Sequence, residues 1–339
     1  MAYTTINKSS DYFNTKLYTG NGSTNAITGV GFQPDWTWIK SRDYSDSHSV
    51  YDAVRGVTKR IRPNHTNAEQ TLANSLTAFG SDGFTVGSDG QDNSNSQTYA
   101  SWNWKANGAG SANTDGSISS TVSANTTSGF SIVSYTGTGS NATVGHGLGV
   151  APKMFILKNR SSGDYNWSVW HGNLSTPTTA RIAINTNSAQ QNHSSYWNNS
   201  IPDTTILNLG TDAGHNGSGN SMIAYCFAEI PGYSKFGKIK GNGNNDGPFC
   251  YLGFSPSFML YKKIGTGDWY IMDNKRPGYN DNDKRLYTNT SQAEETYDLI
   301  NLYSNGFKLT NTTHTYTNDS DSEYLYMAWG QSIVGSNNV

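Results

Sequence analysis

Two pairs of carboxylates have the residue types that acid–base catalysis requires. Asp52 and Glu69 lie in the first third of the chain, and Asp273 and Glu294 lie at matching positions in the last third. Glycosidases use two carboxylates about 5–10 Å apart, so each pair is a candidate for glycan hydrolysis. Active sites rarely persist in duplicate, however, and Glu69 and Glu294 each begin a segment of helical character, where a carboxylate stabilises the helix N-terminus. We expect structural pairs, with a capsule-degrading glycanase as the third functional hypothesis.

Each aspartate is followed three residues later by an arginine. Arg55 follows Asp52, and Arg276 follows Asp273. A guanidinium at this spacing can form an ion pair with the aspartate at the end of a strand, or it can clamp a carboxylate of a bound ligand. We expect the ion pair and keep both arginines as candidate ligand or interface contacts.

Four tryptophans occur in two closely spaced pairs, Trp36 with Trp38 and Trp102 with Trp104. We expect one member of each pair to point into a core and the other toward a surface or a neighbouring domain. An exposed aromatic ring flanked by Asn, Asp and Ser suits contact with a glycan or a protein. The four tryptophans are therefore candidate interface residues.

The sequence has no motif for a metal, a cofactor or a nucleophile. The seven histidines lack the spacing that places two ligands on one face, and no Walker loop or G-x-S-x-G sequence occurs. Three acidic loops, at 89–92, 281–283 and 319–321, carry the oxygen ligands that calcium prefers, but none matches a defined calcium loop. We expect no cofactor, with calcium as the alternative. Cys226 and Cys250 lie in apolar runs and are expected to be buried, reduced thiols.

The composition argues against several classes of function. The 339 residues include 23 Lys+Arg and 25 Asp+Glu, for a net charge of -2 with no basic cluster, so neither nucleic acid nor an anionic membrane is an expected partner. No stretch approaches 18 apolar residues, and the N-terminus lacks the apolar region of a secretory signal. The 36 Gly, 21 Tyr, 12 Phe and 9 Trp indicate a turn-rich β protein with an aromatic core.

The chain contains an internal repeat of about 100–118 residues. Three segments align, at 18–40, 135–158 and 239–262, and the first and third copies keep matching downstream as far as a closing aromatic strand. The second copy is divergent. Short β-rich runs between Gly and Pro predict strands, and only 67–76 and 292–302 have helical character.

We therefore predict an all-β protein of three tandem β-sandwiches. The first would span residues 1–105. The second would span 106–230 and begin with a Gly/Ser/Thr-rich linker at 106–128. The third would span 231–339.

Long phrases of the sequence resemble a known family. YTGNGS, GFQPDWTWIKSRD, AEQTLANSLTAFGSDGFTVGS, TYASWNWKANG, AYCFAEIPGYSKFG and MAWGQSIVGSNNV are similar to virion structural proteins of marine bacteriophages that infect picocyanobacteria and other ocean bacteria. The resemblance runs from residue 2 to residue 339. It implies concanavalin-like or jelly-roll β-sandwiches in a protein often described as tail-fibre-like, and it transfers no catalytic or binding residue.

These observations together predict a non-enzymatic virion structural protein on the particle surface. The first hypothesis is a tail-fibre or receptor-binding component that attaches to host surface glycans through weak multivalent contacts. Capsid decoration or a head knob is the alternative, because no coiled-coil or collagen-like shaft is visible. Expected partners are other virion proteins, a host glycan and further copies of this chain, with a trimer as the natural guess for a fibre. Assembly in the reducing cytoplasm of the host bacterium agrees with two unpaired cysteines.

Overall fold

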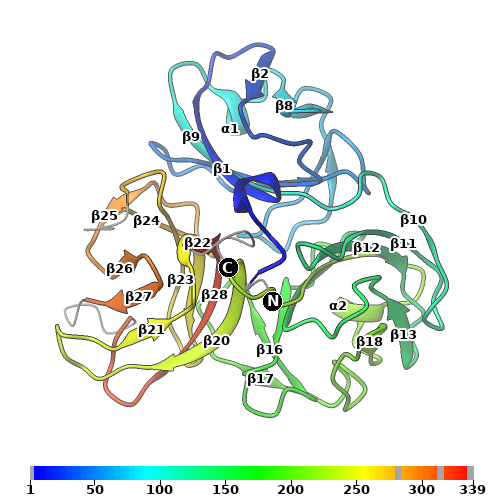
Figure 1. Cartoon of the computed structure of the whole chain (residues 1–339). Coiled ribbons are helices and arrows are strands. Elements are labelled where there is room, and N and C mark those ends of the chain that lie inside the picture. Colours follow the sequence, from blue (N-terminus) through cyan, green and yellow to red (C-terminus); the bar gives the residue numbers. More distant parts are fainter. Residues whose placement is uncertain (1–3, 279–283, 311–316, 334–339) are drawn as a thin grey trace.

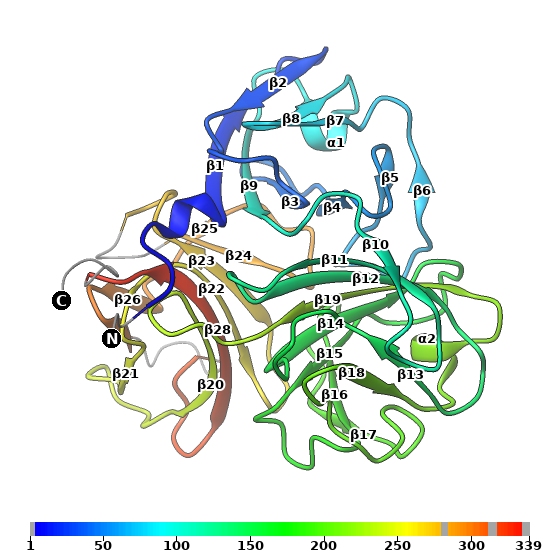
Figure 2. The same ribbon diagram turned by 45° about the vertical axis from the view of Figure 1, so that its right-hand side comes forward.

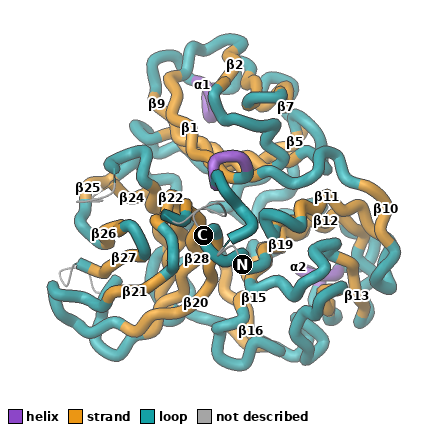
Figure 3. The backbone as a smooth tube through the Cα atoms, in the orientation of Figure 1, coloured by secondary structure: helices purple, strands orange, loops and turns teal. Residues whose placement is uncertain are grey.

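Three lobes surround a common centre, one lobe from each sequence repeat (Figure 1). The computed structural model describes residues 4–278, 284–310 and 317–333. Antiparallel strands account for almost all regular structure in these residues (Figure 3). Their only helical elements are short: η1 (Ser9–Asp11), α1 (Gly90–Asn93) and α2 (Ala213–Asn216). The prediction of an all-β sandwich fold is confirmed.

Lobe 1 is a sandwich of two sheets and a short hairpin. The larger sheet has the order β1 (Phe13–Thr19), β9 (Thr98–Trp104), β3 (Trp36–Ser41), β4 (Ser49–Asp52). The smaller sheet has the order β2 (Asn25–Thr28), β8 (Gly83–Val86), β7 (Leu76–Gly80). The hairpin pairs β5 (Lys59–Arg60) with β6 (Gln70–Thr71).

Lobe 2 repeats the arrangement with a longer large sheet. Its eight strands run β10 (Ser111–Asn113), β11 (Ser120–Asn125), β12 (Phe130–Thr136), β19 (Ser221–Phe227), β14 (Met154–Asn159), β15 (Ser168–His171), β16 (Ala180–Ala183), β17 (Gln191–Asn192). Two strands form its small sheet: β13 (Ala142–Gly145) and β18 (Ile206–Leu209).

Lobe 3 has a six-stranded and a three-stranded sheet. The larger runs β20 (Ser234–Lys240), β28 (Glu323–Gln331), β22 (Ser255–Lys263), β23 (Trp269–Asp273), β24 (Lys284–Tyr287), β25 (Glu295–Thr296). The smaller runs β21 (Phe249–Tyr251), β27 (Gly306–Leu309), β26 (Ile300–Tyr303). The four-strand core β1-β9-β3-β4 therefore recurs as β12-β19-β14-β15 and as β20-β28-β22-β23.

Each large sheet is apolar on both faces, because one face fills its own sandwich and the other meets the neighbouring lobes. In β3, all six residues are buried. Ile39 belongs to the interior of lobe 1, whereas Trp36 and Trp38 belong to a cluster that contains residues of all three lobes. Figure 2 shows the large sheets of lobes 2 and 3 side by side beneath lobe 1. The repeats share one central core.

Three aromatic residues meet at this centre, one from each lobe. Strand register makes Trp104, Phe227 and Trp329 equivalent, because they pair with Trp36, Met154 and Phe258 on the corresponding strands β3, β14 and β22. The ring centroids are 6.5 Å apart for Trp104 and Phe227, 5.2 Å for Phe227 and Trp329, and 5.7 Å for Trp104 and Trp329. These are contact distances for aromatic pairs.

Backbone hydrogen bonds join the lobes head to tail. Glu69 N donates to Arg160 O at 2.9 Å, which defines seam 1–2. Gln190 N donates to Ile264 O at 2.9 Å across seam 2–3, and Glu294 N donates to Arg42 O at 2.8 Å across seam 3–1. Heterologous contacts of this kind close into a ring when the rotation per unit matches the number of units. Here the ring closes within one chain.

A second set of equivalent hydrogen bonds lies nearer the centre. Trp167 Nε1 donates to Arg62 O at 3.0 Å, and Trp269 Nε1 donates to Ala183 O at 2.8 Å. In lobe 1 a histidine takes this position, with His48 Nε2 2.6 Å from Tyr287 O. Trp38 Nε1 donates to His48 Nδ1 at 2.8 Å, so the proton of the neutral ring is on Nε2, which donates.

Two local predictions are wrong. The segments 67–76 and 292–302 contain strands β6 and β25 and the beginnings of β7 and β26 rather than helices, because their backbone groups find partners in neighbouring strands. The expected linker at 106–128 supplies β10 and β11 to the large sheet of lobe 2. The domain limits at 105/106 and 230/231 stay predictions, although every sheet draws its strands from one of these segments.

In the part of the chain that the structure describes, no helix has the length and apolar character needed to cross a membrane.

The central triad predicts that the three lobes unfold together. Phe227→Ala should lower the free energy of unfolding by about 3–5 kcal/mol, the usual cost of removing a buried aromatic ring. Trp104→Phe should cost much less, because lobe 2 already has phenylalanine at the equivalent position. Denaturant titration followed by fluorescence and by circular dichroism measures both effects. Two separate transitions in the wild-type chain would contradict a shared core.

Candidate functional site

All four candidate tryptophans lie in the central core. Trp36, Trp38, Trp102 and Trp104 are each at most 2% exposed. Residues two apart on a strand share a face, and in β3 and β9 this face turns toward the other lobes, so that Trp36 stacks on Tyr225 with ring centroids 4.7 Å apart. The expectation that the two members of each pair point in different directions, one into a core and the other toward a surface or a neighbouring domain, is wrong, because all four belong to the cluster shared by the lobes. Trp36, Trp102 and Trp104 contact aromatic rings of neighbouring lobes, and Trp38 packs against rings of its own lobe.

Asp52, Arg55 and Glu69 form one buried ionic cluster. The Arg55 side chain is fully buried, and its Nε donates to the Asp52 carboxylate. Its Nη1 donates to Glu69 Oε2 at 3.0 Å and to the Lys59 carbonyl at 2.6 Å, and its Nη2 donates to the Val50 carbonyl at 3.1 Å. The predicted ion pair is confirmed, and Arg55 is enclosed by protein groups.

Lobe 2 completes this cluster across seam 1–2. Arg160 Nη1 lies 2.9 Å from Glu69 Oε2, and the Tyr225 hydroxyl donates to Asp52 Oδ2 at 2.7 Å. Glu69 therefore joins an arginine of its own lobe to an arginine of the next. It caps no helix.

Seam 3–1 has the same cluster with equivalent residues. Arg276 Nε donates to Asp273 Oδ2 at 2.6 Å, and Arg276 Nη1 donates to Glu294 Oε2 at 3.1 Å. From lobe 1, Arg42 Nη2 donates to Glu294 Oε1 at 2.8 Å, and Trp102 Nε1 donates to Asp273 Oδ2 at 3.0 Å. We call these two clusters the ionic clasps.

Seam 2–3 replaces the whole clasp with residues that carry no fixed charge. His171 stands at the position of Asp52, Leu174 at that of Arg55, Gln190 at that of Glu69 and Ile264 at that of Arg160. Leu174 belongs to the central cluster, and Ile264 packs against it. The third seam is therefore uncharged where the other two are ionic.

Two carboxylates of the clasps are held in their ionised form by the neighbouring arginines. Burial disfavours the ionised forms of Glu69 and Asp273, but the neighbouring arginines outweigh it and lower the pKa of both carboxyls. A glycosidase acid needs the opposite, a raised pKa at an accessible position. Burial does raise the pKa of Asp92 to about 6, but this carboxyl is 1% exposed and accepts the Tyr51 hydroxyl at 2.5 Å inside lobe 1.

In two of the acidic loops proposed for calcium, carboxylates form ion pairs with nearby lysine and arginine side chains. Asp89 forms the N-cap of α1 and pairs with Arg60 at 2.8 Å, and Asp321 pairs with Lys240 at 2.7 Å. Asp319 pairs with Lys263. The 281–283 loop lies outside the described residues. Among the residues that are described, no three His, Cys, Asp or Glu side chains gather as a metal site would require.

The two cysteines are free thiols, as expected. Cys226 is fully buried, and this burial raises its pKa to about 12. Cys250 is only partly buried, so the expectation of burial holds for Cys226 and in part for Cys250.

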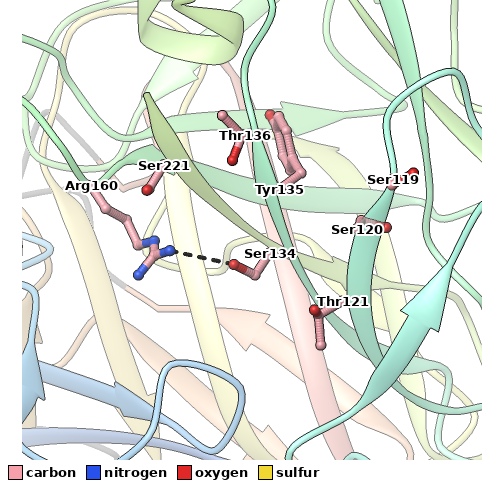
Figure 4. A pocket seen from close by; sticks show the side chains of 8 residues that line it. All are labelled: Ser119, Ser120, Thr121, Ser134, Tyr135, Thr136, Arg160 and Ser221. Atoms are coloured by element: carbon pink, nitrogen blue, oxygen red, sulfur yellow. Dashed lines mark hydrogen bonds between the residues drawn. The ribbon is translucent and has the colours of Figure 1, made fainter. Parts of the chain in front are cut away.

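A polar hollow opens on the large sheet of lobe 2 beside seam 1–2 (Figure 4). Its volume is about 360 Å³. Arg160 reaches across it toward Ser134, with Nη2 3.4 Å from the hydroxyl, while its buried Nε has no hydrogen-bond partner. The lining residues are Ser119, Ser120, Thr121, Ser134, Tyr135, Thr136, Arg160 and Ser221.

Hydroxyls and a guanidinium suit a polar ligand such as a saccharide or an anion. No carboxylate or histidine lines the hollow, so its described lining offers no general base. Sequence reasoning missed this site, because its serines and threonines are indistinguishable from the general composition and Arg160 lies in the divergent copy. The arginine two residues after the strand lysine, Arg42 in copy 1 and Arg160 in copy 2, was the available signal.

The model of a family described as a domain of unknown function, DUF7483, matches residues 8–332. The chain belongs to the DUF7483 family. This match spans all three lobes, so the DUF7483 domain corresponds to the closed ring rather than to a single sandwich. No curated protein matches the chain.

The uncharged seam 2–3 of this DUF7483 domain predicts how an ionic clasp responds to mutation. Arg55→Leu alone should destabilise the protein by about 3–5 kcal/mol, because it leaves Asp52 buried without its cation. Adding Asp52→His, Glu69→Gln and Arg160→Ile copies seam 2–3 into seam 1–2 and should recover part of that loss. Chemical denaturation of the single and quadruple variants measures the difference. A quadruple variant less stable than the single one would contradict the equivalence of the seams.

His171 predicts a loss of stability in acid. Burial lowers its pKa to about 3, and its Nδ1 accepts the Asn173 amide at 3.1 Å. Between this value and the unfolded pKa of about 6.5, the unfolded chain binds more protons, so stability falls as pH falls. From pH 7 to pH 5 the wild type should lose about 2 kcal/mol more than His171→Gln. Unfolding titrations at both pH values test this, with the exposed His193→Gln as control. Equal losses in wild type and His171→Gln would refute it.

Proposed function

We propose that this protein is a non-enzymatic structural component of a bacteriophage virion, exposed on the particle surface, where it contacts host surface glycans as a tail-fibre or receptor-binding component. The proposal rests on the observation that the candidate catalytic residues form ion pairs with one another. The carboxylates and arginines with a catalytic spacing all take part in the ionic clasps between lobes. The hollow on the large sheet of lobe 2 is shallow and polar and suits ligand contact rather than catalysis.

The closed ring also suits a particle that must withstand its surroundings. Three lobes that share a core and are joined in sequence along the chain present their outer sheets in fixed directions (Figure 1). Fixed directions let weak contacts on separate copies add by avidity. The phage assignment rests on the resemblance of the sequence phrases given above.

Capsid decoration is the second candidate, and one observation favours it. The described residues close into a compact body without a coiled-coil or collagen-like shaft, whereas a long fibre needs an extended stalk. A decoration protein would need no glycan contact.

The copy number per particle distinguishes these candidates. Purified virions analysed by quantitative mass spectrometry should contain far fewer copies of this chain than of the major capsid protein, as expected for a tail or vertex component. A copy number comparable with that of the capsid protein would favour shell decoration instead.

Absence from the particle would refute both structural roles. The glycanase hypothesis would then be tested by release of reducing sugar from host polysaccharide, with Glu69→Gln and Glu294→Gln as variants. If the variants are only less stable and release of reducing sugar is unchanged, both glutamates have a structural role in the clasps and no catalytic one.

A further inference from the structure

The small sheet of lobe 3 presents an aromatic face to solvent. Phe249 and Tyr251 on β21 and Tyr303 on β26 are 46%, 58% and 37% exposed. Residues two apart on a strand share a face, and so do residues directly opposite in the register. Phe249 pairs with Lys308, and Tyr251 pairs with Gly306, which in turn pairs with Tyr303. All three aromatic side chains therefore lie on the same outer face.

This face is a grid of two rows on three strands, which we call the platform. One row is Phe249, Lys308, Asn301, and the other is Tyr251, Gly306, Tyr303. With strands about 4.8 Å apart and residues two apart separated by about 7 Å, the grid measures about 10 Å by 7 Å. Phe307 and Leu309, which alternate with the grid residues on β27, face the interior of lobe 3.

The aromatic residues are not required by the fold. The register places Ala26, Thr28 and Gly80 of lobe 1 at the positions of Phe249, Tyr251 and Tyr303. Lobe 1 nevertheless forms the same three-stranded sheet around an equivalent interior. In lobe 2, Thr143 and Gly145 stand at the positions of the two β21 aromatics. Three exposed aromatic rings are therefore a property of lobe 3 alone.

The platform is ordered before any ligand arrives. The Phe249 and Tyr303 rings contact each other at 74°, with centroids 5.9 Å apart. Only glycine fits at position 306 beside these rings, because a Cβ there would lie 2.7 Å from Phe249 Cζ and 2.1 Å from the Cys250 carbonyl oxygen. Lys235 Nζ donates to the Tyr251 carbonyl at 2.9 Å and lies 5.7 Å from the centroid of its ring.

Polar groups surround these rings, and one of them is unsatisfied. Asn301 Oδ1 is buried and has no hydrogen-bond partner, a condition that costs free energy unless a ligand or water supplies a donor. Lys308 pairs with Asp246 at the rim of the platform, where both remain accessible. The face thus combines aromatic surface with an accessible ion pair.

This combination fits a hexopyranose better than a protein. A sugar ring has an apolar C–H face that stacks on aromatic rings and hydroxyl edges that hydrogen-bond to accessible groups such as Lys308 and Asp246. A stable protein partner needs about 800 Å² on each side, and a grid of about 10 Å by 7 Å supplies only a small part of that area. The area matches one or two sugar rings.

We propose that the platform of Phe249, Tyr251 and Tyr303 is a binding site for hexopyranose units of a surface polysaccharide. It rests on the glycan contact proposed above, which it places on the outer face of lobe 3. Each copy of the chain would bind weakly through this small area, and several copies on one particle would bind a repeating polysaccharide by avidity.

The test compares the chain with a variant that carries the lobe 1 residues on β21 and an alanine in place of Tyr303. An array of neutral and acidic hexopyranose oligosaccharides identifies a probe that the full chain binds, and calorimetry then measures its affinity. Phe249→Ala, Tyr251→Thr and Tyr303→Ala together should weaken binding about tenfold or more. The midpoint of unfolding should change little, because lobe 1 folds with Ala26 and Thr28 at the first two of these positions.

Two control variants make the result specific. Tyr44→Ala removes an exposed tyrosine outside the platform, and Ser134→Ala changes the polar hollow of lobe 2. Both should keep wild-type affinity. A platform variant that binds as well as the wild type would overturn this proposal alone, and a loss with Ser134→Ala would move the glycan contact to the hollow. Failure of the wild-type chain to bind any oligosaccharide on the array would overturn the platform and the glycan contact together.

Discussion

Contact among Trp104, Phe227 and Trp329 is the interaction on which the rest of the structure depends. Each large sheet has a second apolar face that its own small sheet does not cover, and an isolated lobe would expose it to water as a large aromatic patch. Burying three such faces against one another removes this patch only when all three lobes are present. The sequence repeat therefore specifies parts of one folded body, and the family match across residues 8–332 agrees with that unit.

Closing the ring sets a second requirement, because the polar edges of the lobes become buried where they meet. At two seams the buried charged groups are paired in an ionic clasp, in which every arginine has carboxylate or carbonyl partners. At the third seam the charged groups are absent, and Leu174 and Ile264 stand in place of the arginines. A buried ion pair and a well-packed apolar contact are often similar in stability, whereas a half-complete pair is costly. Seam 2–3 accordingly differs from the ionic clasps at all four positions.

The fold class could be predicted from the sequence because short β-rich runs, glycine turns and the internal repeat all pointed to the same answer. The ion pair of Arg55 with Asp52 could be predicted from spacing alone. Its location could not, since Tyr225 and Arg160 come from another repeat and nothing local identifies them. The prediction divided each tryptophan pair between a core and a surface or neighbouring domain, but residues two apart on a strand share a face. Whether that face meets another lobe or solvent is not distinguishable in the sequence. The segments 67–76 and 292–302 look helical by composition, but pairing with neighbouring strands overrides that weak preference.

The repeat itself separates structural residues from candidates for function. A requirement of the closed ring is imposed three times, so aromatic rings occupy the centre in every lobe, and a backbone hydrogen bond of the same geometry crosses every seam. A ligand, by contrast, needs only one binding site, in one of the three lobes. Asp52 and Asp273 occupy equivalent positions and serve equivalent seams, which marks them as parts of the architecture. Phe249, Tyr251 and Tyr303 have small counterparts in lobe 1 and cover no part of the interior. Exposed aromatic rings that the fold does not require call for an explanation outside the fold, and a ligand supplies one.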